Sequence, residues 1–444
     1  MISYKYRFLL ISIFILFSPT IFAEMNGRGQ IFEILDEIEL QSTAQEKIIV
    51  PTTNMWQRIN SGYQLRAKKT KRITKRINKY EKWYVQRPEY MERMLKRSEK
   101  YLYYVSNEVQ KRSMPMEIAL LPMIESAYNP IAKSNKKAVG LWQFISSTGK
   151  LYGLKQNWWR DDRRSVIQGT DAALNYLEKL HDQFNSWELA LAAYNAGEGR
   201  VSRAIKRNKK RKKATDYYSL KLPRETRNYV PKLIAMRNIL QNPSEYGIYV
   251  PKLLDQPYFS TVKIPAEIDT ELIPQFAEIS MEEFQFLNAE HKRPLLKARN
   301  VSQSVLIPVN AVERFNINLN SYNKPLISWK TYKPKRGERI KRVAKKFGTN
   351  EKLLRKINRL RSRKTFRRNS IVLIPNENAS STNFALNDKV GLFNYSTIIT
   401  HKISSGDTLG RLSRKYKISI RDLMEFNELK SHKIILGAIL DIPK

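Results

Sequence analysis

The clearest periodic pattern lies in the middle of the chain. Apolar residues recur with the spacing of an amphipathic helix in "AALNYLEKL" (172–180) and "WELALAAY" (187–194). Helix-forming residues are frequent throughout 88–240, and glycines interrupt the pattern in "AVGLWQF" (138–144) and "AYNAGEGR" (193–200). We therefore predict an all-helical domain over 88–240.

A second pattern repeats in the C-terminal part of the chain. Two segments keep one register at an offset of 69 residues, and the paired positions are Gly337 with Gly406 and Asn358 with Asn427. Each segment has a short apolar strand before the glycine, two short amphipathic stretches and a final apolar strand that ends in Ile-Pro. The repeat predicts two βααβ modules, over 327–376 and 397–444.

A fainter copy of the module precedes these two. "ISMEEFQFLN" (279–288) parallels "ISIRDLMEFN" (418–427), and "LIP" follows at 306–308, but the opening glycine is absent. This points to a degenerate module over 257–310. The expected fold class is mainly α, with a helical domain followed by small α+β modules.

The composition limits the partners. The chain has 444 residues with 42% hydrophobic content, which suggests two to four domains with packed cores. Lys and Arg total 80 against 41 Asp and Glu, a formal net charge of +39. Such a positive field implies polyanionic surroundings, which can be nucleic acid, anionic lipid or an acidic polymer.

The chemistry available to the side chains is also limited. The chain has no cysteine and only four histidines, which are scattered along it. Disulfides and thiol catalysis are excluded, and a zinc-ligand cluster is not expected. We predict no metal site and no cofactor.

The N-terminus narrows the choice of polyanion. Residues 1–23 have a basic start, an apolar stretch and a break at Pro19, which is typical of a secretory signal peptide, although an uncleaved anchor remains an alternative. A helical or linker region is expected over 24–87. Export separates a protein from nucleic acid, so we expect an envelope polymer as partner and no nucleic acid. No cysteine follows the cleavage site to carry a lipid.

The densest basic run is "KRNKKRKK" (206–213), with seven basic residues in eight. In an exported protein we interpret it as a solvated loop near the substrate groove, which favours association with anionic envelope surfaces. A charged loop with no partner is the alternative.

One carboxylate stands in an apolar run. "ALLPMIESAYNP" (119–130) carries Glu125 among Leu120, Leu121, Met123 and Ile124. Such a glutamate is commonly a surface residue or half of a salt bridge. An apolar setting would instead raise the pKa of its carboxyl group, which suits a general acid.

Four motifs together carry a resemblance: "IESAYNP" (124–130), "KSNKKAVGLWQF" (133–144), "AYNAGEGRV" (193–201) and "LPRETRNYVPKL" (222–233). Their order and spacing resemble the lytic murein transglycosylases, above all the membrane-bound lytic transglycosylase D family, in which LysM modules follow the catalytic domain. The resemblance implies a lysozyme-like helical fold that cleaves the MurNAc to GlcNAc β-1,4 bond of peptidoglycan and leaves 1,6-anhydro ends.

The same resemblance assigns roles to individual residues. Glu125 matches the single catalytic acid/base. The residues that match substrate-binding positions are Ser134, Gln143, Tyr194, Asn195 and Tyr229. Two departures are visible: Trp142 stands where the family often has methionine, and the lipid-bearing cysteine is absent.

The repeated modules resemble LysM domains, which bind glycans that contain N-acetylglucosamine. The C-terminal copy fits best, and its expected glycan-binding residues are Gly406, Asp407, Thr408, Leu409 and Asn427. In the preceding copy Glu338, Arg339 and Ile340 replace Asp-Thr-Leu, so we expect weaker sugar binding there.

Two other functions stay open at this point. A hydrolytic muramidase on the same fold would usually need a second carboxylate, and within the motifs only Glu198 and Glu225 are available; both are expected to be solvent-facing caps or ion pairs with a neighbouring arginine. A wall-binding protein without activity is the other alternative. All three imply the periplasm or cell envelope of a Gram-negative bacterium, with peptidoglycan strands as partner.

Overall fold

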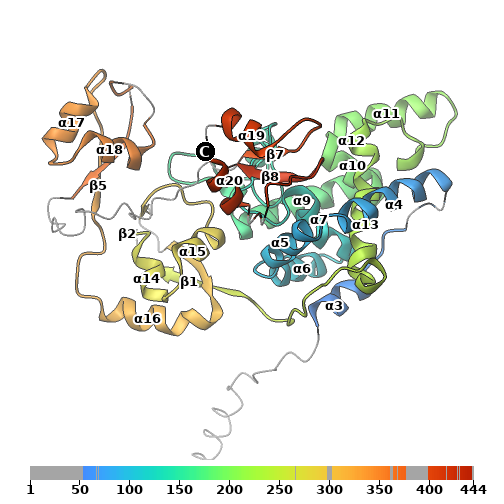
Figure 1. Ribbon diagram of the computed structural model, residues 1–444, viewed down its shortest axis with the longest axis horizontal. Helices are drawn as coiled ribbons and strands as arrows, with labels where there is room; N and C mark the ends of the chain where they lie inside the picture. The colour runs from blue at the N-terminus through green and yellow to red at the C-terminus, as the bar shows by residue number, and fades with distance from the viewer. Residues whose placement is uncertain are drawn as a thin grey trace, which may run out of the picture. The chain divides into compact units, whose positions relative to one another are not determined.

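The computed structural model describes residues 54–442 apart from 67, 69, 266, 298–302, 361–363, 368, 377–398, 417, 428 and 430 (Figure 1). The predicted signal peptide over 1–23 and the first part of the region over 24–87 lie outside the described residues. Within the described part, none of the helices combines the length and the apolar character that crossing a bilayer requires.

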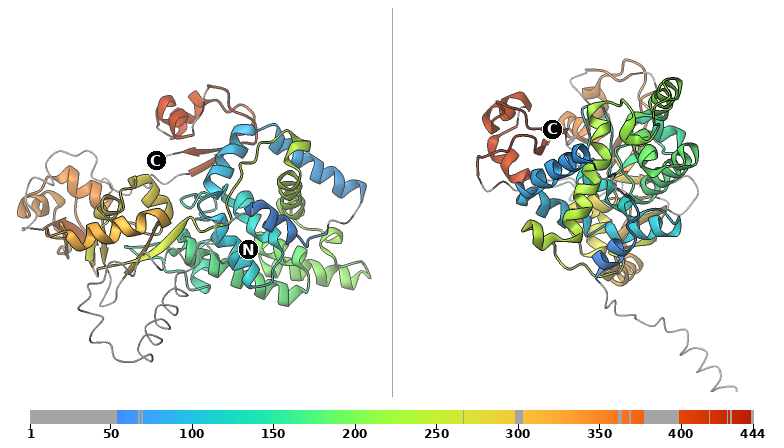
Figure 2. Two further views of the ribbon diagram at one scale, coloured as in Figure 1. Left: turned by 90° about the horizontal axis from the view of Figure 1, so that it is seen from below. Right: turned by 90° about the vertical axis from the view of Figure 1, so that its right-hand side faces the viewer.

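The first part of the described chain is helical, as predicted. The α-helices in chain order are α3 Met55–Ser61, α4 Lys71–Val85, α5 Pro88–Ser98, α6 Leu102–Lys111, α7 Leu121–Ser126, α8 Ser146–Leu151, α9 Val166–Phe184, α10 Trp187–Ala196, α11 Glu198–Lys210, α12 Arg224–Arg227 and α13 Tyr229–Gln241. Short 3₁₀ helices lie between them: η1 Met116–Leu120, η2 Asp162–Arg164, η3 Tyr217–Ser219 and η4 Pro243–Tyr246. These helices run in several directions around one core (Figure 2).

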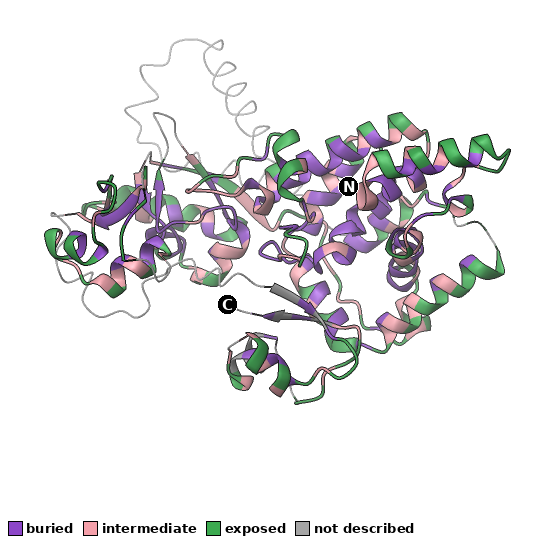
Figure 3. Ribbon diagram, turned by 90° about the horizontal axis from the view of Figure 1, so that it is seen from above, coloured by how far each residue is buried: buried purple, intermediate pink, exposed green. Residues whose placement is uncertain are grey.

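Local sequence fixes the ends of the two central helices. The Ser165 side chain caps α9 by accepting from the Gln168 N–H, and Asn185 ends it in the left-handed conformation. Ser186 then caps α10 in the same way, and Gly197 ends it with φ +89°. Helix α9 has a buried face and exposed residues such as Asp171 and Lys179, whereas α10 has no exposed residue and buries Leu189–Ala193 completely or nearly so (Figure 3 colours each residue by its burial). The pair is thereby held in a fixed antiparallel arrangement against the core.

The basic run over 206–213 departs from its prediction. We expected a solvated loop, but residues 206–210 form the last turns of α11, and only 211–213 lie beyond it. Cations at the C-terminal end of a helix interact favourably with the helix dipole, so the charge run supports this helix instead of breaking it.

The C-terminal modules have the predicted βααβ order. One consists of β5 Trp329–Tyr332, α17 Ile340–Lys346, α18 Glu351–Asn358 and β6 Val372–Pro375; the other consists of β7 Ile399–Lys402, α19 Leu409–Tyr416, α20 Ile420–Phe426 and β8 Ile439–Ile442. In both, the first and last strands pair antiparallel, with Trp329 opposite Pro375 and Ile399 opposite Ile442. Each module has its own apolar core.

The degenerate copy is the same unit with additions. Its elements are β1 Phe259–Ile264, β2 Glu267–Asp269, α14 Leu272–Ala277, α15 Met281–Leu287, β3 Leu295–Lys297, β4 Gln303–Pro308, η5 Val309–Ala311 and α16 Val312–Ser321. Strands β1 and β4 pair antiparallel as the outer strands of the other modules do. A hairpin of β2 with β3 and the helix α16 complete it.

One buried asparagine recurs in the modules. Asn288 donates to the carbonyls of Phe284 and Leu306 at 3.0 and 2.7 Å and accepts from the Leu306 N–H at 2.8 Å. Asn358 makes the same three bonds to Leu354 and Leu373 at 2.9, 2.8 and 2.6 Å. We call this arrangement the asparagine clasp, because it ties the second helix of a module to its last strand.

Candidate active site

Glu125 lies in the last turn of α7, which is short for a local reason. Pro122 lies in its first turn, where proline is tolerated, and the helix ends at Ala127 and Tyr128, which have positive φ of 52° and 55°. The Tyr128 ring is fully buried, and its hydroxyl donates to the Ala119 carbonyl at 2.7 Å. These contacts fix the turn that carries Glu125. The Glu125 side chain itself stays partly exposed.

Two side chains from α13 reach this glutamate. The Tyr229 hydroxyl donates a hydrogen bond to Glu125 Oε1. One turn later Lys232 donates through Nζ to the Ile124 carbonyl at 2.8 Å, which places its charge beside the carboxyl group. Sequence reasoning selected Tyr229 and missed Lys232, although the i, i+3 spacing within the fourth motif could have identified it.

The balance of these contacts sets the protonation of Glu125. Loss of hydration in the protein interior raises the pKa of the carboxyl group. The hydrogen bond from Tyr229 and the charge of Lys232 act in the opposite direction, but burial outweighs them and the pKa remains raised. The apolar neighbours in the sequence belong to the core: Leu120, Leu121 and Met123 are fully buried.

Tyr194 is the second tyrosine near Glu125. Its hydroxyl donates to the Trp142 carbonyl at 2.8 Å, and Glu125 is among the charges that affect it. Burial raises the pKa of both Tyr194 and Tyr229 well above the usual tyrosine range, so both remain neutral O–H groups. The Tyr194 ring also contacts Phe144 edge to face and Tyr176 at a tilt, with centroids 6.3 and 5.5 Å away. Aromatic faces of this kind suit pyranose rings.

Ser134 and Gln143 belong to one folded loop between α7 and α8. Ser134 Oγ accepts from the Ala138 N–H at 3.1 Å, and Gln143 Nε2 donates to the Gly140 carbonyl at 2.9 Å. Gly140 has φ +86°, and a Cβ there would lie 1.8 Å from the Arg163 carbonyl oxygen, so only glycine fits. Ser126 Oγ joins the loop to α7 by donating to the Leu141 carbonyl at 2.9 Å.

Two other motif residues have supporting contacts. Asn195 accepts through Oδ1 from the Thr226 hydroxyl at 2.9 Å, which ties the third motif to the fourth. Trp142, the departure from methionine, is fully buried and donates through Nε1 to Thr170 Oγ1 at 3.0 Å. Trp142 therefore belongs to the core beneath the loop.

The two candidate second carboxylates are engaged elsewhere. Glu198 pairs with Lys179 at 3.1 Å, and Glu225 pairs with Lys136 at 3.2 Å. The Glu225 side chain is 67% exposed. The expected ion pairs are present, but lysines from other segments supply the positive charge instead of neighbouring arginines. In the described ranges, no group of three or more His, Cys, Asp or Glu side chains is arranged to hold a metal ion.

The two complete LysM-like modules open with equivalent turns. Gly337 and Gly406 have φ of +78° and +85°. Asp407 accepts from the Ser404 N–H at 2.7 Å and lies 2.8 Å from His401 Nε2, contacts that lower its pKa. Glu338, at the corresponding position, accepts from the Lys335 N–H at 2.9 Å and the Tyr332 hydroxyl at 3.2 Å. The acidic residue thus holds the turn in both modules.

The other predicted module residues divide between surface and core. Thr408 Oγ1 accepts from the Arg411 N–H at 3.2 Å and so caps α19, a bond for which Arg339 offers no acceptor. Leu409 and Asn427 are buried, and Asn427 donates to the Leu423 carbonyl at 2.8 Å. Their part in glycan binding stays a prediction, and their positions indicate support of the fold.

Three protein families match parts of the chain. The Transglycosylase SLT domain matches residues 103–217, and the LysM domain matches 332–364 and 401–443. The family described as "Lytic transglycosylase MltD, LysM-like domain" matches 258–324, which contains the degenerate copy.

Curated relatives extend this match. The chain is 34% identical over 392 residues to "Membrane-bound lytic murein transglycosylase D" of Escherichia coli (strain K12), covering 85% of this chain and 83% of that protein. It is 36% identical over 186 residues to "Putative tributyltin chloride resistance protein" of Alteromonas sp. (strain M-1), covering 42% of this chain and 88% of that protein. It is 32% identical over 171 residues to "Putative soluble lytic murein transglycosylase" of Haemophilus influenzae, covering 36% of this chain and 28% of that protein.

Proposed function

We propose a single-glutamate mechanism for this chain, which belongs to the membrane-bound lytic murein transglycosylase D family and is a lytic murein transglycosylase. In this mechanism Glu125 cleaves the β-1,4 bond from MurNAc to GlcNAc in peptidoglycan, first as acid and then as base. The observation that carries the proposal is the raised pKa of Glu125, produced by burial beside Tyr229 and Lys232.

The first step needs a protonated carboxyl group. Because burial raises its pKa, Glu125 keeps its proton closer to neutral pH than an exposed glutamate does. It gives this proton to the glycosidic oxygen while the bond from that oxygen to C1 of MurNAc breaks. The GlcNAc hydroxyl leaves, and the N-acetyl group of the substrate stabilises the positive charge that develops at C1.

The second step uses the carboxylate that the first step leaves. Glu125 now accepts the proton of the C6 hydroxyl of the same MurNAc, and O6 bonds to C1 to close the 1,6-anhydro ring. The proton balance is closed, because Glu125 ends as it began and no water is consumed. The hydrogen bond from the Tyr229 hydroxyl and the positive charge of Lys232 stabilise the carboxylate between the two steps.

The motif residues around Glu125 bind and orient the sugars in this proposal. Gln143 and Ser134 present amide and hydroxyl groups from the folded loop, and the Tyr194 ring offers an aromatic face. Asn195 acts through Thr226 to keep the fourth motif in place. Each contact of this kind contributes about 1–3 kcal/mol to the transition state.

Glycan binding by the modules completes the proposal. The LysM modules hold the strand while the catalytic domain cleaves it. The module over 397–444 binds more strongly because it keeps the Asp-Thr-Leu sequence at 407–409, which the other module replaces with Glu-Arg-Ile at 338–340. Deletion of 397–444 should therefore reduce sacculus binding more than replacement of 327–376. We also propose that the protein acts in the periplasm, which agrees with the name "Membrane-bound" of its Escherichia coli relative.

Product analysis of digested sacculi tests the mechanism. If O6 is the acceptor, every new MurNAc end is a 1,6-anhydro-MurNAc and is one water lighter than the reducing end that hydrolysis leaves. Reducing ends as the main product would overturn the proposal in favour of a hydrolytic muramidase. In that case Glu198→Gln and Glu225→Gln, made one at a time, would show which second carboxylate is needed.

A further inference from the structure

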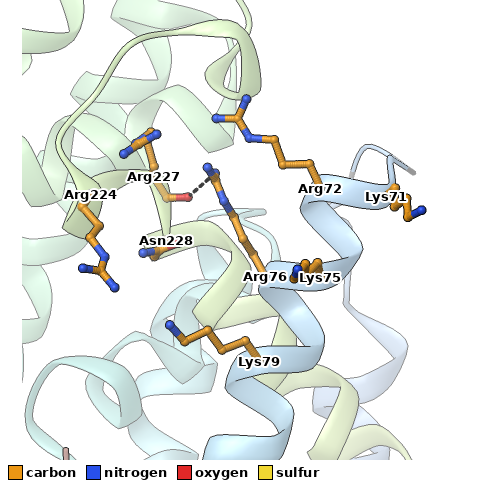
Figure 4. Close-up of a pocket in the computed structure, with 8 residues that line it drawn as sticks. All are labelled: Lys71, Arg72, Lys75, Arg76, Lys79, Arg224, Arg227 and Asn228. Carbon is orange, nitrogen blue, oxygen red and sulfur yellow. Dashed lines mark hydrogen bonds between the residues drawn. The ribbon is translucent and has the colours of Figure 1, made fainter.

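A groove lined by positive side chains and one amide lies between α4 and α12. The cavity has a volume of about 610 Å3 (Figure 4). On α4 the spacing of the basic residues puts them on one helical face, while Ile73 and Ile77 on the opposite face are buried. We call the cavity the basic groove, and its lining residues are Lys71, Arg72, Lys75, Arg76, Lys79, Arg224, Arg227 and Asn228.

No acidic residue offsets this charge within the groove. Its lining contains seven cations and one neutral amide. Glu225 on α12 is the neighbouring acid, but its carboxylate is paired with Lys136 at 3.2 Å. The pKa of Arg76 is lowered, first by loss of hydration and then by repulsion from Arg72 and Arg227. The folded chain therefore holds these cations together against their mutual repulsion.

One of the arginines that line the groove carries a buried hydrogen-bond donor without an acceptor. Arg76 reaches across from α4 and donates through Nη1 to the Arg227 carbonyl at 3.1 Å, as the dashed line in Figure 4 shows. The Nε of Arg227 is buried, and among the described residues it has no hydrogen-bond partner. A buried donor without a partner costs free energy, and the guanidinium group that carries it belongs to a residue that lines the groove. This observation is independent of the charge count.

The chemistry of the lining identifies the kind of anion. Four of the seven cations are guanidinium groups, whose planar forks match the oxygens of phosphate and carboxylate. Seven positive charges in one cavity exceed what an isolated carboxylate can offset, whereas each phosphate carries up to about two negative charges. Closely spaced phosphates therefore fit the charge density best.

We propose that the basic groove binds a ligand with closely spaced phosphate groups. Two sources share this chemistry, a soluble polyphosphate and the phosphorylated headgroup of an envelope lipid. Binding would attach the catalytic domain to a phosphorylated partner independently of the LysM modules. Asn228 lines the groove directly before Tyr229, so the attachment point and the donor to Glu125 are adjacent in the chain. The inference does not depend on how the glycan bond is cleaved.

Calorimetric titration of the full chain with tripolyphosphate at about 0.15 M salt tests the proposal. We expect saturable binding that Lys75→Glu with Lys79→Glu weakens at least about tenfold, since both positions line the groove. The matched control is Lys206→Glu with Lys210→Glu, two exposed positions on α11 that change the net charge by the same amount. This pair should weaken binding less than about twofold.

Three results would overturn the proposal. The first is that tripolyphosphate shows no saturable binding. The second is that the two groove substitutions and the two control substitutions weaken tripolyphosphate binding equally. The third is that an oligoglutamate of equal charge binds as tightly as tripolyphosphate. Thermal melting of both pairs checks that they are folded. Sedimentation with vesicles of anionic phospholipid identifies the source: binding that the groove pair loses supports a lipid headgroup, and tripolyphosphate binding without vesicle binding supports a soluble ligand. Neither measurement uses glycan cleavage.

Discussion

Two glutamates eight residues apart have opposite environments in the catalytic domain. Glu117 in η1 is fully buried, and its carboxylate accepts from the backbone N–H groups of Gln64 and Leu65, both at 3.0 Å, and from Arg237 at 3.1 Å. Glu125 in α7 is partly exposed, and among the described residues its hydrogen-bond donor is Tyr229.

The difference shows that burial alone does not make a carboxylate a catalyst. Three donors, one of them the charged Arg237, compensate Glu117 for its lost hydration. Because these donors come from the segment around Leu65 and from α13, Glu117 ties η1 to both. Glu125 has lost hydration without gaining equal compensation, which is why its pKa is raised. A group in that condition can hold a proton and release it. Four substitutions test the contrast.

Glu125→Gln should have the largest effect, on activity. Removing the acid/base should lower the release of soluble muropeptides from sacculi about 10³-fold. The variant should fold, and at pH 8 it should melt at a higher temperature than the wild type. A raised folded-state pKa means that stability is lost as pH rises through that pKa, and glutamine does not titrate. Near wild-type release would remove Glu125 from its proposed role.

Glu117→Gln should instead lower stability and leave the activity of the folded protein largely intact. The substitution leaves Arg237 with an uncompensated buried charge, so we expect a loss of about 3 kcal/mol in the free energy of unfolding. This free energy is measured from the unfolding transition of the catalytic domain in denaturant. The fraction that remains folded should still cleave sacculi, and complete inactivity of a well-folded variant would show that the contrast between the two glutamates is wrong.

Tyr229→Phe should change the pH dependence of activity. The tyrosine lowers the pKa of Glu125, so its removal raises that pKa further. Because the acid form is active, the fall in kcat/KM on the alkaline side should move to higher pH. We also expect about a tenfold lower maximum, from loss of one hydrogen bond to a charged group. An unchanged pH profile would mean that Tyr229 does not affect the protonation of Glu125.

Lys232→Met should give the smallest effect in the same direction. Its charge also lowers the pKa of Glu125, but it ranks below the Tyr229 hydrogen bond. The alkaline limb should move less than in Tyr229→Phe, with less than about a threefold change in the maximum. A shift of the alkaline limb to lower pH would contradict the sign of the Lys232 contribution.

The sequence predicted the parts of this molecule that short motifs encode. Glu125, Tyr194 and Tyr229 were predicted because each stands in a short motif that resembles those of the transglycosylases. The structure places both tyrosines near the Glu125 carboxyl group. The helical domain and the βααβ modules followed from periodicity and the internal repeat, and this fold class is confirmed.

The remaining features depend on contacts between distant segments. The basic groove joins α4 to α12 across about 150 residues, so no window of sequence contains it, and the denser run over 206–213 drew attention instead. Likewise, nothing local distinguishes Glu117 from an exposed glutamate, since its partners are Leu65 and Arg237. Long-range pairing of this kind is decided by the packed fold.

The asparagine clasp bears on how the three modules arose. Asn288 keeps all three clasp bonds in the copy that lacks the opening glycine, whereas Gly337 and Gly406 remain in the other two. After a duplication, a module can lose its opening glycine turn and still fold, but removing the clasp would leave buried backbone groups without partners. Shared ancestry among such repeats is therefore recorded more durably in the buried asparagine than in the opening turn.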